Sequence, residues 1–133
     1  MQATIRESLV TLVNDAYVAA YPSIPIVYDN QPFDRNSPPM LWVEFEIKFA
    51  GGKQAGMSAS PRTRISGWVY VTVWAKDGLG TKTSLSILDW FSQQTGYARP
   101  LGVTLEAPQP EFVSSPPGWH CEQLKLHFYS APT

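Results

Sequence analysis

Apolar and polar residues alternate along two stretches in the middle of the chain. Odd positions are apolar from Leu41 to Phe49, and again from Ile65 to Val73 if Gly67 is counted with them. Successive side chains of a β-strand point to opposite faces, so the pattern predicts strands over 40–49 and 63–75. We expect a hairpin with Ile47 opposite Ile65, because this register matches aliphatic residues with one another. The same register pairs Leu41 with Val71, Val43 with Val69, Trp42 with Tyr70, Glu46 with Ser66 and Lys48 with Arg64.

The remaining strands are shorter or lie later in the chain. Residues 50–62 are rich in glycine, alanine and serine and are predicted to form a long flexible connector. A short strand is expected over 26–28 and a longer one over 119–129. Residues 103–107 and 111–113 resemble one edge strand interrupted by prolines at 108 and 110, because proline cannot donate to a neighbouring strand.

Two stretches have the 3.6-residue apolar period of helices. The first covers 3–20, with Thr4 as the expected N-cap and Glu7 three residues later, as in a capping box. Its apolar stripe is Ile5, Leu9, Leu12, Val13, Ala16 and Ala20. The second helix covers 81–95 and is followed by Gly96, which suits the position after a helix end. Its apolar side is Leu85, Ile87, Leu88 and Phe91.

The expected order of elements is α-β-β-β-α-β-β. This order is typical of an α+β domain in which two helices pack on a mostly antiparallel sheet. A chain of 133 residues fits a single domain spanning residues 1–133. Hydrophobic residues make up 44% and charged residues 16%, which excludes an intrinsically disordered chain.

Composition also excludes several classes of protein. The formal net charge of −1 does not favour a globally basic nucleic-acid binder. One cysteine excludes an intramolecular disulfide and a multi-cysteine zinc site. The first residues lack the apolar core of a signal peptide, and no stretch approaches the ~20 apolar residues that span a membrane. We therefore expect a cytoplasmic protein without a membrane partner.

No segment has the residue pattern of a catalytic or cofactor site. Gly78–Thr83 lies between a strand and a helix, as a phosphate loop does, but Thr81 stands where such a loop needs glycine. His120, Cys121 and His127 belong to one predicted strand, where alternation and spacing keep them from converging on one ion. We therefore predict no catalytic residue, no cofactor and no metal, and we interpret Gly78–Thr83 as a turn before a helix.

Charge is segregated along the chain. Residues 48–76 contain no acidic residue and carry five positive charges, whereas residues 29–46 have a net charge of −3. The basic stretch includes Lys53, Arg62 and Arg64. It is either a solvated hairpin tip or a contact with an acidic neighbour or nucleic acid, since local charge orients partners.

Aromatic residues gather on one face of the predicted hairpin. If the aliphatic face is the core, Trp42, Trp68, Tyr70 and Trp74 lie on the opposite face. A monomer rarely exposes such a patch to water, so we expect either a helix or another subunit to cover it. These four residues, with Lys53, Arg62 and Arg64, are the candidate subunit interface. Stacking on single-stranded bases is less favoured, because Glu44 and Glu46 on this face would repel phosphates.

Three segments give the chain a resemblance to a known family. They are the opening helix at Thr4–Leu9, the stretch Pro25–Phe33, and Gly67–Val73 before a glycine-containing turn and helix. In these segments, and in its order of elements, the chain resembles the small tail-terminator and tail-completion proteins of long-tailed phages and prophages. This family includes phage-derived domains first described without a function. In it, an α+β subunit forms a ring of about six copies that caps the tail tube.

The resemblance implies a structural protein that is not an enzyme. Its expected partners are its own copies, the tail-tube protein and head-completion or connector proteins, with DNA only as passing cargo. Its expected location is the host bacterial cytoplasm during assembly and then the virion tail. One alternative is another head–tail connector or neck component. An alternative of a different class is a small ligand-binding domain or enzyme that uses the Gly78–Thr83 turn.

Overall fold

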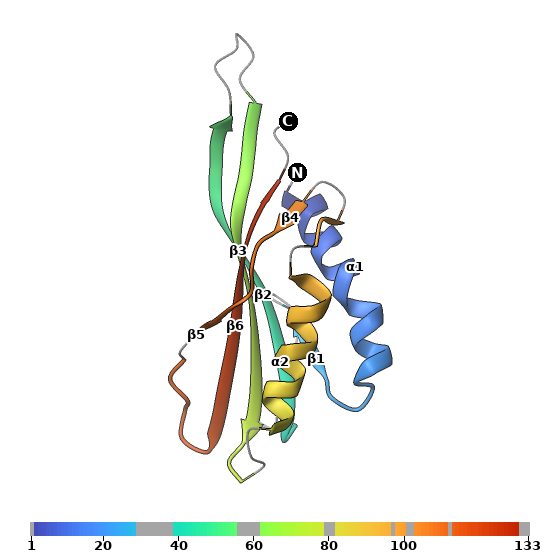
Figure 1. Ribbon diagram of the computed structural model, residues 1–133. Coiled ribbons are helices and arrows are strands. Elements are labelled where there is room, and N and C mark those ends of the chain that lie inside the picture. The colour runs from blue at the N-terminus through green and yellow to red at the C-terminus, as the bar shows by residue number, and fades with distance from the viewer. Residues whose placement is uncertain are drawn as a thin grey trace.

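Two helices cover one face of a six-stranded sheet (Figure 1). The computed structural model describes residues 2–28, 39–55, 62–78, 82–96, 98–100, 103–111 and 113–130, with the backbone alone at 2, 51–55 and 62–64. The elements are α1 (Gln2–Ala20), β1 (Ile26–Tyr28), β2 (Leu41–Ala55), β3 (Arg62–Lys76), α2 (Lys82–Thr95), β4 (Val103–Leu105), β5 (Gln109–Glu111) and β6 (Trp119–Ser130). The predicted α+β class and order are confirmed, with β4 and β5 together forming the interrupted strand. Within these residues, neither helix is long and apolar enough to cross a membrane.

The strands are arranged in the order β1-β2-β3-β6-β4, and β5 also pairs with β6. All these pairs are antiparallel except β1 with β2. The position of β4 and β5 at a sheet edge was predicted from the two prolines. The break between them covers 106–108, so Pro108 lies in it, but Pro110 lies within β5. An edge position tolerates Pro110 because only one side of the strand is paired.

The hydrophobic core lies between the helices and the sheet. α2 contacts β3 and β6, and α1 contacts α2. Buried side chains come from both layers: Ile5, Leu9, Val13 and Tyr17 of α1, Ile87, Leu88 and Phe91 of α2, and Val43, Phe45, Ile47, Val69, Val71, Val73, Leu124, Leu126 and Phe128 of the sheet. Two predicted core positions are wrong, since Leu85 is 47% exposed and Ala20 is exposed. Tyr17, whose ring contacts Trp90 and Phe91 of α2, lies in the core instead.

β2 and β3 pair in a register four residues away from the predicted one. Ile47 lies opposite Val69, Trp42 opposite Trp74 and Lys48 opposite Trp68. A shift by an even number keeps every side chain on its predicted face, so alternation alone could not distinguish the two registers. The observed register stacks Trp42 on Trp74, which the predicted one would separate.

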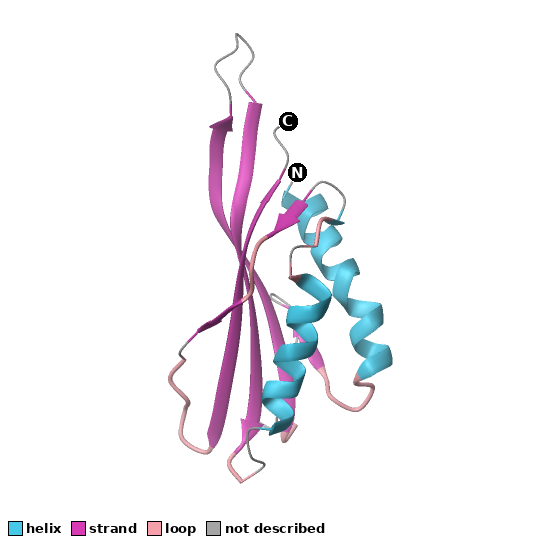
Figure 2. Cartoon of the chain, in the orientation of Figure 1, coloured by secondary structure: helices cyan, strands magenta, loops and turns pink. Residues whose placement is uncertain are grey.

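The predicted connector over 50–62 is wrong at both ends. β2 continues to Ala55 and β3 begins at Arg62, so only residues 56–61 of this stretch lie outside the described residues. Between the pairs Phe49–Gly67 and Gly52–Ile65, β2 has two residues where β3 has one, which is a β-bulge. Figure 2 shows the two strands extending past the rest of the sheet.

The helix ends differ in detail from the capping predictions. α1 already begins at Gln2, so Thr4 lies inside the helix and is not its N-cap. α2 ends at Thr95, directly before Gly96, as predicted. Gly96 does not have the positive φ of a left-handed cap. Its need for glycine is steric, because a Cβ there would lie 2.7 Å from the Ser92 carbonyl oxygen and 3.3 Å from Pro108.

Candidate interaction surface

The face of the sheet that points away from α1 and α2 is called here the open face. It is formed by the even residues of β2 up to Lys48, the even residues of β3 and the odd residues of β6. Cross-strand pairing arranges these side chains in rows across the sheet. Trp42, Trp74 and Cys121 form one row, Glu44, Thr72 and Gln123 the next, then Glu46, Tyr70 and Lys125, and finally Lys48, Trp68 and His127.

Three tryptophans form a cluster at one end of the open face. The rings of Trp42 and Trp74 stack with centroids 5.2 Å apart and planes 5° apart. Trp119 meets Trp74 edge-on at 6.3 Å. Trp42 is 3% exposed, and Trp74, which contacts both of the other rings, is half-buried. Burial also raises the pKa of the neighbouring Cys121 thiol, which disfavours the thiolate.

The middle of the open face is polar and hollowed. Gln123 Nε2 donates to Thr72 Oγ1 at 2.9 Å, which ties β6 to β3. The cavity here, called the open-face hollow, has a volume of about 480 Å³. Its lining is Glu44, Glu46, Lys48, Tyr70, Thr72, Trp74, Glu111, Val113, Gln123 and Lys125. The three carboxylates and two ammonium groups in this lining give it a net negative charge.

Two lysines line the hollow at the end away from the tryptophan cluster. Lys48 Nζ is 3.2 Å from Glu46 Oε1 and 5.4 Å from the centroid of the Tyr70 ring. Lys125 Nζ is 2.8 Å from Glu111 Oε2 and 4.8 Å from the centroid of the Trp68 ring. The hydrogen bond to Glu111 raises the pKa of Lys125 above its usual value, so this ammonium stays charged. Each cation therefore contacts a carboxylate and an aromatic ring.

Beyond these rows, β2 and β3 continue alone as a two-stranded ribbon. We call the paired residues Gly52–Ala55 and Arg62–Ile65 the arm. β6 pairs with β3 only as far as Ser66, although Ser130 Oγ still accepts a hydrogen bond from the Ile65 amide at 3.0 Å. A two-stranded ribbon is marginally stable in water unless something packs against it.

The structure places four of the predicted interface residues on the open face. Trp42 and Trp74 are stacked in the first row, Tyr70 lies in the third row and Trp68 in the fourth. Lys53, Arg62 and Arg64 lie on the paired backbone of the arm, and their side chains fall outside what the structure describes. Of the two predicted covers for the aromatic face, a helix or another subunit, the helix is wrong, because both helices pack on the opposite, aliphatic face. Sequence reasoning missed Trp119, Lys125 and Glu111, which reach this surface only through β6 and β5.

The other candidates for chemistry are separated. Cys121 and His127 share the open face but lie in different rows, and His120 pairs with Glu122 at 2.8 Å on the other face. No three His, Cys, Asp or Glu side chains among the described residues are grouped so that they could hold a metal ion. Of the Gly78–Thr83 turn, residues 79–81 lie outside the described part of the chain, and α2 begins at Lys82.

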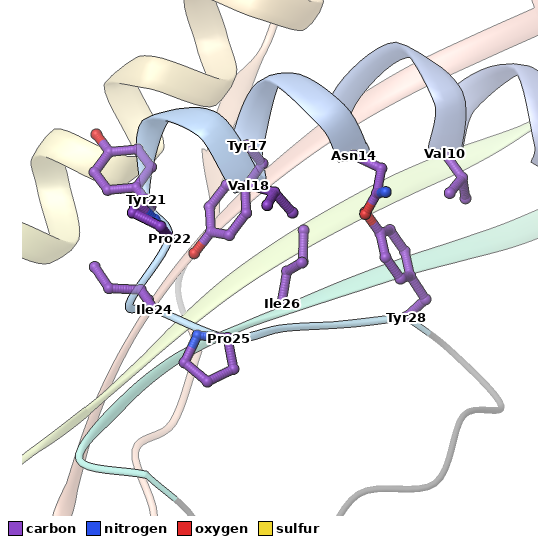
Figure 3. A pocket seen from close by; sticks show the side chains of 10 residues that line it. All are labelled: Val10, Asn14, Tyr17, Val18, Tyr21, Pro22, Ile24, Pro25, Ile26 and Tyr28. Atoms are coloured by element: carbon purple, nitrogen blue, oxygen red, sulfur yellow. The ribbon is translucent and has the colours of Figure 1, made fainter.

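A second hollow of about 530 Å³ lies between α1 and β1. Its lining is mostly apolar, and the Tyr28 hydroxyl crosses it to donate to Asn14 Oδ1 at 2.7 Å (Figure 3). The Tyr17 hydroxyl points into the same hollow (Figure 3) and is buried without a hydrogen-bond partner among the described residues. Desolvation is the main reason that the pKa of Tyr28 is raised to about 12, and it raises the pKa of Tyr17 as well.

Comparison with known proteins identifies the fold and no function. No protein-family model matches the chain, and no curated protein matches it. A solved structure that bears only a sequence identifier as its name aligns with 98% of this chain and 96% of its own length. The TM-score is 0.75 at 15% identity, so the likeness shows a shared fold alone.

Proposed function

We propose that this protein is a structural component of phage or prophage tail assembly and is not an enzyme. In this proposal it is a tail terminator: about six copies form a ring that caps the tail tube and joins it to the head. The proposal assigns it to the host bacterial cytoplasm during assembly and to the virion tail afterwards. The resemblance at Thr4–Leu9, Pro25–Phe33 and Gly67–Val73 supports this function.

The observation that carries the proposal is that the helices cover only one face of the sheet. The aliphatic face is covered by α1 and α2, whereas the open face retains half-buried Trp68, Tyr70 and Trp74. Aromatic side chains on an uncovered surface are typical anchors of protein interfaces. The arm adds a second patch, and a ring needs two different patches on each subunit.

The test is the mass of the protein in solution, measured by analytical ultracentrifugation over a wide concentration range. The measurement is made with and without the tail-tube protein. We expect a discrete ring, and we expect the K53E/R62E/R64E variant to impair its formation. A chain that stays monomeric at every concentration, with the tube protein present, would overturn the proposal. Rings that bind only connector proteins would instead assign it to the neck.

A nucleotide titration separates the proposal from a ligand-binding role of the Gly78–Thr83 turn. We expect no saturable nucleotide binding. Saturable binding that is lost in Lys82→Ala would favour the ligand-binding alternative over the structural one. DNA binding that weakens strongly with salt would indicate a nucleic-acid module instead.

A further inference from the structure

The second hollow, between α1 and β1, is called here the helix–strand hollow, and one continuous segment of the chain builds it. All of its described lining belongs to residues 10–28, which cover much of α1, the turn after it and β1. Its volume of about 530 Å³ is within the range of pockets that hold small molecules. Figure 3 shows Ile26 and Tyr28 pointing from β1 toward the helix.

Hydrogen bonds hold the two walls of this hollow in place. The Tyr28 hydroxyl donates to Asn14 Oδ1 at 2.7 Å, which ties β1 to α1 across the hollow. The Val43 amide donates to the Pro25 carbonyl oxygen at 2.9 Å, which attaches the start of the β1 wall to β2. The walls are therefore positioned by the fold itself, as is usual for sites that take small molecules.

Tyr17 supplies a hydrogen-bond donor that the described residues do not use. Its side chain is fully buried, and its ring contacts Phe91 at 5.5 Å and Trp90 at 5.7 Å. The hydroxyl points into the hollow (Figure 3) and has no partner among the described residues. Burial raises the pKa of Tyr17, so the hydroxyl keeps its proton and can donate it. A buried donor without an acceptor lowers stability, and an acceptor atom on a ligand would remove that cost.

The lining favours an uncharged ligand. Its described residues include none with a charged side chain, and their polar groups are the Asn14 amide and three tyrosine hydroxyls. Burying an ion against such a lining would leave its charge unpaired, which costs free energy. The remaining surface consists of aliphatic side chains, proline rings and tyrosine rings, which offer apolar contact to a ring-shaped molecule.

We propose that the helix–strand hollow binds an uncharged, mainly apolar small molecule that carries one acceptor oxygen, such as an aryl ketone, and that the Tyr17 hydroxyl donates to this oxygen. A small molecule is favoured over the surface of a protein partner because Tyr17 is fully buried, so the acceptor has to enter the hollow to meet it. This inference goes beyond the proposed function and does not depend on it, since neither the open face nor the arm takes part.

The experiment compares two ligands that differ in the acceptor alone. Acetophenone has a carbonyl oxygen where 2-phenylpropene has a methylene group of nearly the same shape. Each is titrated into the full chain, and the amide NMR shifts of α1 and β1 report saturable binding. The ratio of the two dissociation constants is measured for the parent chain and for Tyr17→Phe, which keeps the ring and removes the donor. We expect this ratio to favour acetophenone by roughly threefold to tenfold more in the parent chain than in Tyr17→Phe.

Two tryptophan substitutions test the location of binding. Val18 lines the hollow and is 51% exposed, so Val18→Trp should occupy part of the space that the ligand needs. We expect it to weaken acetophenone binding by at least about tenfold, because the ligand ring then loses buried apolar contact. Ala19→Trp is the matched control, since it adds the same ring at the next, exposed position of α1, outside the described lining. It should bind acetophenone as the parent chain does, and circular dichroism checks that every variant is folded.

Three results would overturn the proposal. They are the absence of saturable shifts in the parent chain, an equal ratio of dissociation constants in the parent chain and Tyr17→Phe, and undiminished binding in Val18→Trp. If the parent chain binds neither compound and Val18→Trp weakens self-association in sedimentation, the hollow is a contact between protein chains and the small-molecule site is refuted. The ring of the proposed function is decided separately, by the mass of the parent chain in solution.

Discussion

The two faces of the sheet differ in what their side chains pack against. The face toward α1 and α2 is filled by aliphatic and phenyl side chains that share one continuous core. On the open face, indoles stack on one another and lysines lie over aromatic rings while pairing with carboxylates. The difference shows that the helices complete only one face, so the other is available for a partner even though many of its side chains already have neighbours.

The largest effect should come from the core, where Phe91 links the layers. Its ring contacts Tyr17 at 5.5 Å and Phe45 at 6.5 Å. Phe91→Ala should lower the free energy of unfolding by about 3–5 kcal/mol, because it leaves a cavity that the packed layers cannot fill. Urea denaturation measures the loss. A loss below about 1 kcal/mol would mean that the two layers are not tightly packed there.

A smaller effect on stability is expected on the open face. Trp68→Ala removes the ring between Lys125 and His127, which should cost roughly 1–2 kcal/mol of unfolding free energy. Under the proposed function it should also weaken self-association, measured by sedimentation. Trp90→Ala is the control, since Trp90 is a half-buried ring on α2. Equal weakening of association in both variants would contradict the proposal that the open face, and not the helix layer, forms the interface.

The smallest effect on stability is expected from removing either of two tyrosine hydroxyls, and the two substitutions should act in opposite directions. Tyr17→Phe should raise the unfolding free energy by up to about 1 kcal/mol, because it removes a buried donor that lacks a partner. Tyr28→Phe should lower it, since Tyr28 donates to Asn14. Denaturation of both variants at neutral pH measures the two signs, and a loss in Tyr17→Phe would indicate a partner for its hydroxyl.

The same tyrosines predict a loss of stability in alkali. Their pKa values are raised in the folded state, to about 12 for Tyr28, so between pH 10 and 12 the unfolded chain holds fewer protons than the folded one. Unfolding is then favoured as the pH rises. Stability should fall above the ordinary tyrosine value of 10, and Tyr17→Phe should make this fall shallower.

Alternation and periodicity predicted which side of each strand is buried, and they placed most strand and helix ends within two residues. They failed where partners distant in sequence decide. The observed register of β2 and β3 places Trp42 opposite Trp74. Alternation does not distinguish registers that differ by four residues. The lining of the open-face hollow includes Glu111 of β5 and Gln123 and Lys125 of β6, strands that are distant from β2 and β3 in the sequence. The arm was missed because the glycines, alanines and serines of the whole 50–62 stretch favoured a connector.

The bulge between Phe49 and Gly52 changes the phase of β2. Before it, odd residues such as Ile47 point toward the helices; after it, the odd position 53 is paired with Arg64 on the other side. One inserted residue thus shifts the pairing of β2 with β3 by one position for the rest of the ribbon. Deleting Gly51 would remove the extra residue and continue the register of the pairs before the bulge. The count of residues at this step, as much as their identity, determines which residues of the two strands lie opposite each other.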